Sequence, residues 1–360
     1  MDLRIALTGL TAILAFLFFL AVLGQWRTRR HSFQLAWALG MLWFSIGAGC
    51  EAIGAIWGWS EPLYKTWYVT GAVATAAWLG LGTAFLLGRT RFGYAFAFSL
   101  FLAGLFTFLT QQRQQYPDAG ATPVLYFIAA AVLALAISVE TYFQNERWPR
   151  IAALAVVGAT VLAAALAVAA TLPPPGYAVD PATGVPTAAI MPGYLRLLTP
   201  FMNVTGAFSL GFGALFTVYV FMPKKRVLAY SLDPNQKGDV FLFNLLISPV
   251  AFVVNFVASL PGAARAMGSG HISSRVPATV LIAIGAWIPA LTDSLNRFGS
   301  TQFYGIGKLL AVGFLFAGFL VSIDVFSEFR IPFTGVVLHR RRTEPGPDDR
   351  PAADAGASAG

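Results

Sequence analysis

Residues 5–24 read IALTGLTAILAFLFFLAVLG, a run that contains no charged side chain. A helix rises about 1.5 Å per residue, so this run is long enough to cross the ~30 Å hydrocarbon core of a bilayer. Only Arg4 precedes the run closely, whereas Arg27, Arg29 and Arg30 follow it. This charge pattern indicates a first transmembrane helix rather than a cleaved signal peptide. It also predicts that the N-terminus lies outside and that the arginine cluster lies in the cytoplasm.

The composition of the whole chain is typical of a membrane protein. Of its 360 residues, 57% are hydrophobic and 11% are charged, against roughly 25% charged residues in a soluble domain. The net charge of +8 would suit a nucleic-acid-binding protein, but Lys and Arg form short clusters between apolar runs rather than one basic face. That distribution is typical of loops that set membrane topology. We therefore expect the lipid bilayer as the main partner and no nucleic acid.

Six more apolar runs follow the first one. Basic clusters lie in the loops at 89–91, 147–150 and 224–226, after every second run. Because all these clusters then fall on one side of the membrane, the positive-inside rule predicts seven spans up to residue 226. The six runs are 33–57, 66–87, 93–110, 123–143, 151–172 and 201–222.

Three apolar stretches remain in the C-terminal third: Phe241–Leu260, Ala278–Leu291 and Ile306–Val325. If all three crossed the membrane, the arginines at 340–342 would lie outside, against the positive-inside rule. We therefore expect that one of the three stretches does not cross.

The stretch 241–260 is the one that we expect to remain on the cytoplasmic side. It carries Asn244, Pro249 and Asn255, and a proline inside a helix removes a backbone hydrogen bond and favours a kink or a break. A re-entrant segment that turns near Pro249, or an in-plane segment, would restore the charge rule. The sequence thus predicts an all-α polytopic transmembrane helix bundle with about nine spans plus one re-entrant or in-plane segment. The alternative is ten spans.

These elements form one transmembrane helical domain over residues 1–342. Within it, a seven-span unit covers 1–226, an insertion with the re-entrant segment covers 233–275, and a closing helix pair covers 276–328. Residues 343–360 are rich in Pro, Ala, Gly, Asp and Ser, a composition that cannot bury enough apolar area to fold. We expect a disordered cytoplasmic tail there.

Two groups of short motifs suggest a resemblance. The first contains LAWALG at 35–40 and LGLGT at 79–83, and the second contains VLIAIGA at 280–286, RFG at 297–299 and FAGFL at 316–320. Together they resemble a group of uncharacterised bacterial multi-pass integral membrane proteins. The resemblance covers about a third of the chain. It implies a simple closing helix pair with residues 233–275 as an insertion, and it implies no activity.

Four ionisable residues are predicted to share one depth in the outer half of the membrane. They are the candidate ligand-binding residues Glu51, Asp293, Arg297 and Lys308. A charge at the centre of a membrane helix costs roughly 2.5–3.5 kcal/mol on insertion scales, so such residues are functional candidates. Opposite charges at one depth are expected to pair, which reduces the cost of burial. In the alternative, the last three are interfacial and reach water, and Glu51 has one structural partner.

No pattern in the sequence indicates catalysis, a cofactor or a metal. His31, His271 and His339 all fall in or beside predicted cytoplasmic loops, so no pair of histidines could hold a haem between spans. No P-loop, HExxH or GxSxG motif occurs. The single cysteine, Cys50, is expected to be a buried, inert thiol. We expect no cofactor, no metal site and no catalytic residue. A membrane enzyme that acts on lipid is a third alternative, which would need a carboxylate or histidine pair at the interface, and only Asp293 with Arg297 comes close to one.

Two segments are predicted at the outer surface. An aromatic belt at the membrane interface is expected from Trp57, Trp59, Tyr64, Trp67 and Tyr68. The long connection 173–200 is expected to be a lid, a docking segment or a loosely ordered loop. Within it, a short amphipathic turn at residues 194–198 could lie on the interface.

The functional hypothesis from the sequence is a multi-pass protein of the bacterial inner membrane, with the C-terminus in the cytoplasm. An outward-facing polar cavity that contains Glu51 would bind or transport a small ligand or ion. The alternative is a non-catalytic sensor or assembly subunit that packs against other membrane subunits.

Overall fold

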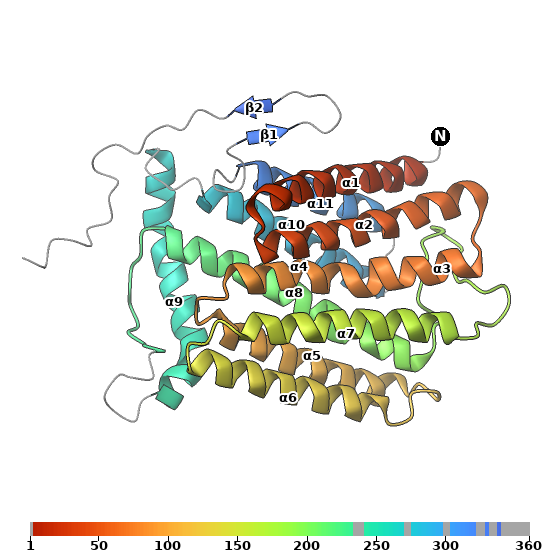
Figure 1. Cartoon of the computed structure of the whole chain (residues 1–360), viewed down its shortest axis with the longest axis horizontal. Coiled ribbons are helices and arrows are strands. Elements are labelled where there is room, and N and C mark those ends of the chain that lie inside the picture. Colours follow the sequence, from red (N-terminus) through yellow and green to blue (C-terminus); the bar gives the residue numbers. More distant parts are fainter. Residues whose placement is uncertain are drawn as a thin grey trace, which may run out of the picture.

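The computed structural model describes residues 3–232, 241–269, 275–297 and 303–321, together with two short strands at 328–330 and 337–339. The predicted tail at 343–360 lies outside the described residues. The described chain is almost entirely helical (Figure 1). The first helices are α1 (Leu3–Arg29), α2 (Ser32–Trp57), α3 (Glu61–Trp67), the π-helix η1 (Tyr68–Ala74), α4 (Thr75–Leu86), α5 (Phe92–Gln114) and α6 (Thr122–Tyr142).

The second half continues with helices and ends in a small hairpin. Its helices are α7 (Trp148–Ala169), α8 (Gly193–Phe221), α9 (Phe241–Gly268), α10 (Arg275–Arg297) and α11 (Tyr304–Val321). The strands β1 (Glu328–Arg330) and β2 (Val337–His339) pair in antiparallel orientation after the last helix.

Local sequence signals explain where several helices begin and end. Pro62, Pro123 and Pro149 lie in the first turns of α3, α6 and α7, where a missing N–H breaks no helical hydrogen bond. Gly58 ends α2 with a φ of 87°, a backbone conformation that glycine adopts without strain. These residues separate the apolar runs into the rods of a bundle.

Among the described residues, nine helices are long and apolar enough to cross a membrane. In this count α3, η1 and α4 form one rod, Glu61–Leu86, and α9 is included; α10 contributes only the shorter apolar part Val276–Pro289. Large apolar side chains are exposed along α6 and α7, at Leu125, Leu135 and Leu154 for example. Such helices are those of a multi-pass membrane protein in contact with the lipid bilayer.

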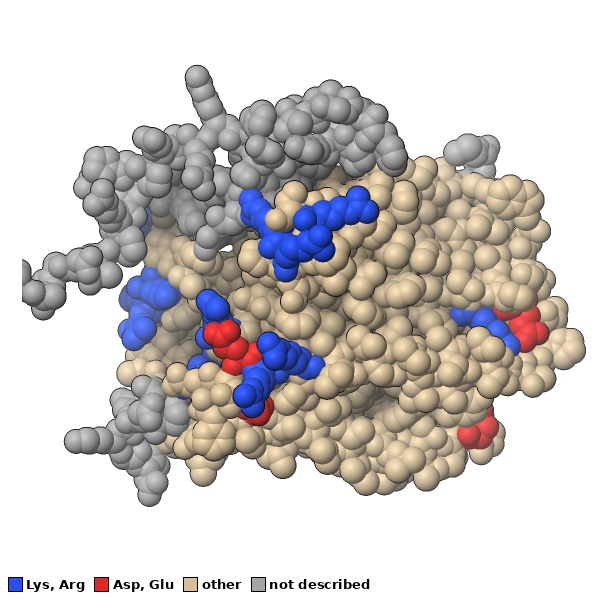
Figure 2. All heavy atoms as spheres, viewed as in Figure 1, with Lys and Arg blue, Asp and Glu red and all other residues tan. Residues whose placement is uncertain are grey.

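Most of the helices run along one axis and alternate in direction (Figure 1). The loops that join them place ten Lys and Arg residues at one end, which we call the basic end. Figure 2 shows most of the visible Lys and Arg there. We call the opposite end the loop end, because the connection 170–192 covers it. The basic end is defined by Arg27, Arg29, Arg30, Arg89, Arg91, Arg147, Arg150, Lys224, Lys225 and Arg226.

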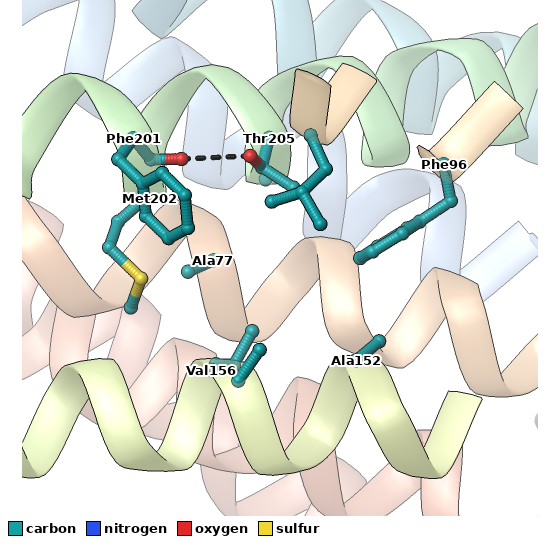
Figure 3. A pocket seen from close by; sticks show the side chains of 10 residues that line it. Ala77, Phe96, Ala152, Val156, Phe201, Met202 and Thr205 are labelled. Atoms are coloured by element: carbon teal, nitrogen blue, oxygen red, sulfur yellow. Dashed lines mark hydrogen bonds between the residues drawn. The ribbon is translucent and has the colours of Figure 1, made fainter. Parts of the chain in front are cut away.

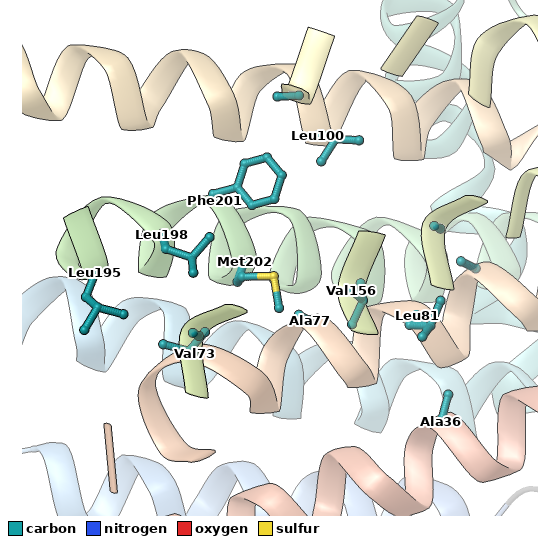
Figure 4. Close-up of a cluster of buried hydrophobic side chains, with 14 of the residues drawn as sticks. Ala36, Val73, Ala77, Leu81, Leu100, Val156, Leu195, Leu198, Phe201 and Met202 are labelled. Carbon is teal, nitrogen blue, oxygen red and sulfur yellow. The ribbon is translucent and has the colours of Figure 1, made fainter. Parts of the chain in front are cut away.

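Small residues bring the helices close together in the centre. At the crossing of α4 and α8, a Cβ on Gly206 would lie 2.2 Å from the backbone of Ala76, and a Cβ on Gly80 would lie 2.7 Å from Gly206. Around this crossing, Val73, Leu81, Val156, Leu198 and Met202 pack into the main hydrophobic core (Figure 4). Close contact of this kind is what drives helix association where lipid is as apolar as the core.

Helix α9 is the exception to the common axis, because it lies crosswise at the basic end (Figure 1). The ring of its first residue, Phe241, packs at a tilt against Tyr94 at the start of α5 and edge-to-face against Tyr142 at the end of α6. Near its other end, Ala263 packs in a cluster with Met222 at the end of α8. Both ends of α9 therefore lie at the basic end, as the in-plane alternative predicted.

The predicted turn at Pro249 is wrong. Helix α9 continues through both Pro249 and Pro261. A proline removes one N–H donor, and the neighbouring turns hold the helix together here. A continuous in-plane helix also needs no cover for broken backbone. By length and composition alone α9 could cross a membrane, but its contacts place it across the bundle.

Two predictions about the loop end also need correction. Helix α8 begins at Gly193 rather than at 201, and it continues through Pro200. Leu195, Leu197 and Leu198 are buried in it and do not lie on the membrane interface. Of the predicted aromatic belt, Trp57 is exposed, whereas Tyr64, Trp67 and Tyr68 are buried. Among these rings, Tyr68 packs against the longer α8, where its hydroxyl bonds to Leu195 and Thr199.

The crosswise position of α9 predicts a labelling pattern. In a Cys50→Ala background, cysteines introduced at Arg226 and Arg265 should react with an impermeant thiol reagent from the same side of the membrane. A cysteine at Ala182, in the loop-end connection, should react from the other side. Labelling is measured separately in right-side-out and inside-out vesicles. Reaction of position 265 together with position 182 would mean that α9 crosses.

Candidate functional site

A buried ion pair joins α2 to α11 near the loop end of the bundle. Lys308 Nζ lies 2.5 Å from Glu51 Oε1 and donates a hydrogen bond to it. Glu51 is 1% exposed and Lys308 is 9% exposed. Burying two charges away from water costs several kcal/mol per ion, and only close pairing with good hydrogen bonds offsets this cost. The free-energy cost of burying this pair is therefore high compared with that of burying apolar side chains.

Two aromatic residues complete the surroundings of the ion pair. Trp67 at the end of α3 donates its Nε1–H to the same Glu51 Oε1, at 2.8 Å. The ammonium of Lys308 lies 4.3 Å from the ring centroid of Tyr304, one turn earlier on α11. A cation near an aromatic face is attracted to the negative ring surface, and more so where water is excluded. The carboxylate and the ammonium thus each have an aromatic partner.

Glycines bring Trp67 within reach of Glu51. A Cβ on Gly47 would lie 2.8 Å from the Cα of Gly71, so α2 and η1 touch along their backbones. Gly47 lies about one turn before Glu51 on α2, and Gly71 lies about one turn after Trp67. A larger residue at Gly47 would therefore push α2 and η1 apart at this crossing.

The π-helix η1 begins directly after Trp67, and two side chains donate hydrogen bonds to its carbonyl groups. Asn203 of α8 donates from Nδ2 to the carbonyl oxygen of Ala72 at 2.7 Å. The hydroxyl of Thr75 donates to the carbonyl of Thr70 at 2.8 Å. A carbonyl left free at membrane depth would cost several kcal/mol. These side chains therefore stabilise the π-turn, a conformation that is frequent at functional sites.

The connection 170–192 packs over the aromatic residues that surround the site. The Tyr64 hydroxyl donates to the carbonyl oxygen of Thr187, and Lys65 Nζ donates to the carbonyl of Ala170 at 2.6 Å. Met191 in the same connection is buried in the main core. Of the three predictions for this segment, a loosely ordered loop is wrong, and the connection is a packed cover.

The structure places two of the four candidate residues side by side, and their role in ligand binding stays a prediction. It brings Glu51 and Lys308 together, as their shared depth suggested, and Lys308 does not reach water as the interfacial alternative required. The side chains of Asp293 and Arg297 lie outside the described residues, so their place in the cluster stays a prediction. Sequence reasoning assigned Trp67 to the interface and did not select Tyr304. Tyr304 begins α11 one turn before Lys308, and this spacing was the available signal for the tyrosine.

A small cavity lies elsewhere in the bundle, between α4, α5, α7 and α8. Its volume is about 20 Å³, and it is lined by apolar side chains such as Ala77, Phe96, Val156 and Met202 (Figure 3). The one hydroxyl drawn there, on Thr205, is bonded to the carbonyl of Phe201. A cavity of this size has room for about one water, and an apolar lining leaves it dry. It therefore offers no ligand site.

The remaining chemistry of the described residues is sparse. They contain no group of three or more His, Cys, Asp or Glu residues that could hold a metal ion. Cys50 is a free, buried thiol. The arrangement at Glu51 offers a pair of opposite charges, one indole donor and one aromatic face.

Comparison with known proteins adds no assignment. No family model matches the chain, and neither a curated protein nor a solved structure matches it. The resemblance drawn from short motifs stays a prediction, and the function has to be argued from the geometry.

Proposed function

We propose that this multi-pass membrane protein binds or moves a small ligand or ion, with Glu51 and Lys308 as the polar centre. The observation that carries the proposal is the 2.5 Å ion pair between α2 and α11. Ionisable residues inside membrane bundles are rare, and they mark ion or ligand pathways in many membrane proteins. A purely structural contact between these two helices would need only apolar side chains.

The surroundings support a site that can change state. Opposite charges on two helices hold those helices together only while both remain charged and paired. An ion or a charged ligand that competes for either partner would therefore weaken the contact between α2 and α11. The packed cover at 170–192 bonds to Tyr64 and Lys65, within one helical turn of Trp67. In this proposal the cover opens to admit the ligand.

The proposal includes an orientation and a membrane. We take the basic end as cytoplasmic and the loop end as outward-facing, because Lys and Arg collect on the cytoplasmic side of membrane proteins. The N-terminus is then outside, and the membrane is a bacterial inner membrane. The site at Glu51 would open outward.

Replacement of Glu51 by glutamine tests the function. The full chain is reconstituted in liposomes, and flux of protons, sodium, potassium and chloride is measured with ion-sensitive dyes. Glu51→Gln keeps the size of the side chain and removes its charge, so we expect flux to fall at least about tenfold, which corresponds to about 1.4 kcal/mol. The matched control is Glu61→Gln, which removes a half-exposed partner of Lys65 at the same end of the bundle.

Binding without flux is measured by the thermal stability of the same variants against a library of small charged molecules. A ligand that stabilises the wild type and not Glu51→Gln supports the site. Equal flux or equal ligand stabilisation in wild type and Glu51→Gln contradicts it. If the wild type shows neither flux nor binding and instead co-purifies with a partner at fixed stoichiometry, the assembly-subunit alternative is favoured.

A further inference from the structure

Helix α9 presents an apolar face away from the bundle at the basic end. The face repeats every three or four residues, so it runs along one side of the helix. Its exposed members are Leu242, Leu246, Val250, Val253, Val257 and Leu260. Because α9 lies across the axis of the bundle (Figure 1), this face runs parallel to the membrane plane. We call it the α9 stripe.

The opposite side of α9 holds the segment that follows α8. Asn255 Oδ1 accepts hydrogen bonds from the backbone N–H groups of Val227 and Leu228, at 2.7 and 2.9 Å. Its Nδ2 donates to the carbonyl of Leu228 at 2.8 Å. Ser259 Oγ accepts from the N–H of Lys225 at 2.8 Å. Asn255 and Ser259 are both 1% exposed, so these bonds form a shielded clamp.

The clamp fixes a basic triplet on the side of α9 that is opposite to the apolar stripe. Lys224, Lys225 and Arg226 are exposed and sit on the clamped segment, and Arg265 is exposed on α9 itself. Gly262 of α9 faces Pro223, with 3.9 Å from a Cβ at that glycine to the proline ring. Residues 223–230 and α9 contain no Asp or Glu. The clamped cations and the apolar face therefore lie on opposite sides of α9, as in a helix that lies in the membrane interface, and neither segment carries a carboxylate.

The apolar face and the cations together indicate which class of molecule binds this surface. If the bundle crosses the bilayer, the basic end lies at the level of the lipid headgroups, and an in-plane helix there has its apolar face at the acyl boundary. Lys and Arg near that level attract anionic lipids. A nucleic acid would use the cations and leave the stripe in water.

We propose that the α9 stripe and the triplet 224–226 form a binding surface for anionic phospholipid of the surrounding bilayer. The phosphate contacts Lys224, Lys225 or Arg226, and the acyl chains lie along the stripe. Asn255 is a positioning residue, because it touches only the backbone of the segment that carries the cations. This surface is independent of Glu51 and Lys308, so it does not depend on the proposed function.

The test compares phosphatidylglycerol with phosphatidylcholine as probes. The purified full chain is exchanged into mixed micelles of either lipid, and the retained lipids are counted by native mass spectrometry. We expect the wild type to prefer phosphatidylglycerol at least about tenfold, and the preference should fall with rising salt. Replacement of Lys224, Lys225 and Arg226 by glutamine should remove the preference.

Three further samples make the outcome decisive. The matched control replaces Arg27, Arg29 and Arg30 by glutamine, which removes three charges at the same end, and it should keep the preference. Asn255→Ala keeps all the charges but frees the segment, and it should lower the preference with an unchanged circular-dichroism spectrum. A soluble glycerophosphoglycerol headgroup should not compete at concentrations equal to the lipid.

Three results would overturn the proposal. The first is equal retention of the two lipids by the wild type. The second is loss of the preference in the control triple and not in the 224–226 triple. The third is full competition by the soluble headgroup, which would show that the stripe contributes nothing and that the site takes a free phosphate group.

Discussion

Replacement of Lys308 by methionine is expected to lower the free energy of unfolding by about 3–5 kcal/mol, the range for breaking a buried ion pair. Methionine keeps the length of the side chain, so packing against Tyr304 changes little. Glu51 is left with the indole of Trp67 as its described donor and must either stay charged without a cation or take up a proton. Both outcomes lower the stability, which is measured by thermal unfolding of the purified chain in detergent.

The double variant separates the charge effect from the packing effect. Glu51→Gln with Lys308→Met removes both charges and should recover most of the lost stability, since an uncharged pair leaves no buried ion. Glu61→Gln breaks a pair with a half-exposed carboxylate and should cost less than about 1 kcal/mol. If Lys308→Met is as stable as the wild type, the two side chains are not paired in the membrane protein.

The number of bundle helices could be predicted because lipid imposes a simple rule on the sequence. Runs such as 5–24 and 123–143 have to be about twenty apolar residues long to cross the bilayer, and charges can lie only between them. The ends were less predictable. Helix α8 begins at Gly193, because polar residues near a helix end are tolerated where protein covers them, and the cover at 170–192 is a tertiary feature.

The predicted turn at Pro249 is also wrong because a tertiary contact was not considered. A proline and two asparagines in an apolar run indicate a break when only the local chain is considered. In the structure, Asn255 is instead satisfied by the backbone of residues 227 and 228, about a full helix away in the sequence. The positive-inside rule still predicted that both ends of α9 lie at the end that carries the other basic clusters, because it counts charges and does not depend on local geometry.

The pairing of Glu51 with Lys308 could be predicted from the depth of the two residues in the membrane alone. Glu51 and Lys308 lie at matching depths in predicted spans, and opposite charges there have few other partners. Trp67 reaches Glu51 only because Gly47 and Gly71 let α2 and η1 touch. Helix register around a π-turn cannot be read from apolar periodicity, which assumes 3.6 residues per turn.

Replacement of Gly206 by leucine is expected to disrupt the bundle at its tightest crossing. Even the first added carbon would lie 2.2 Å from the backbone of Ala76, and backbone cannot move aside as a flexible side chain can. Helices α4 and α8 must then separate, so we expect the free energy of unfolding to fall by about 3 kcal/mol or more, at the upper end of overpacking effects. Separation would also pull Asn203, one turn away on α8, from the carbonyl of Ala72 in η1.

Gly158 in α7 offers a matched control, because a Cβ there would have no atom within 4 Å. Gly158→Ala should leave the stability unchanged or raise it by up to about 1 kcal/mol, since alanine favours a helix more than glycine does. Both variants are compared with the wild type by thermal unfolding in the same detergent. The two substitutions are therefore expected to change the stability in opposite directions. If the membrane bundle tolerated no larger residue at any position, both variants would be less stable than the wild type. A Gly206→Leu protein that unfolds at the wild-type temperature would mean that α4 and α8 do not cross at this glycine. The π-turn beside Trp67 would then lack the support that brings the indole to Glu51.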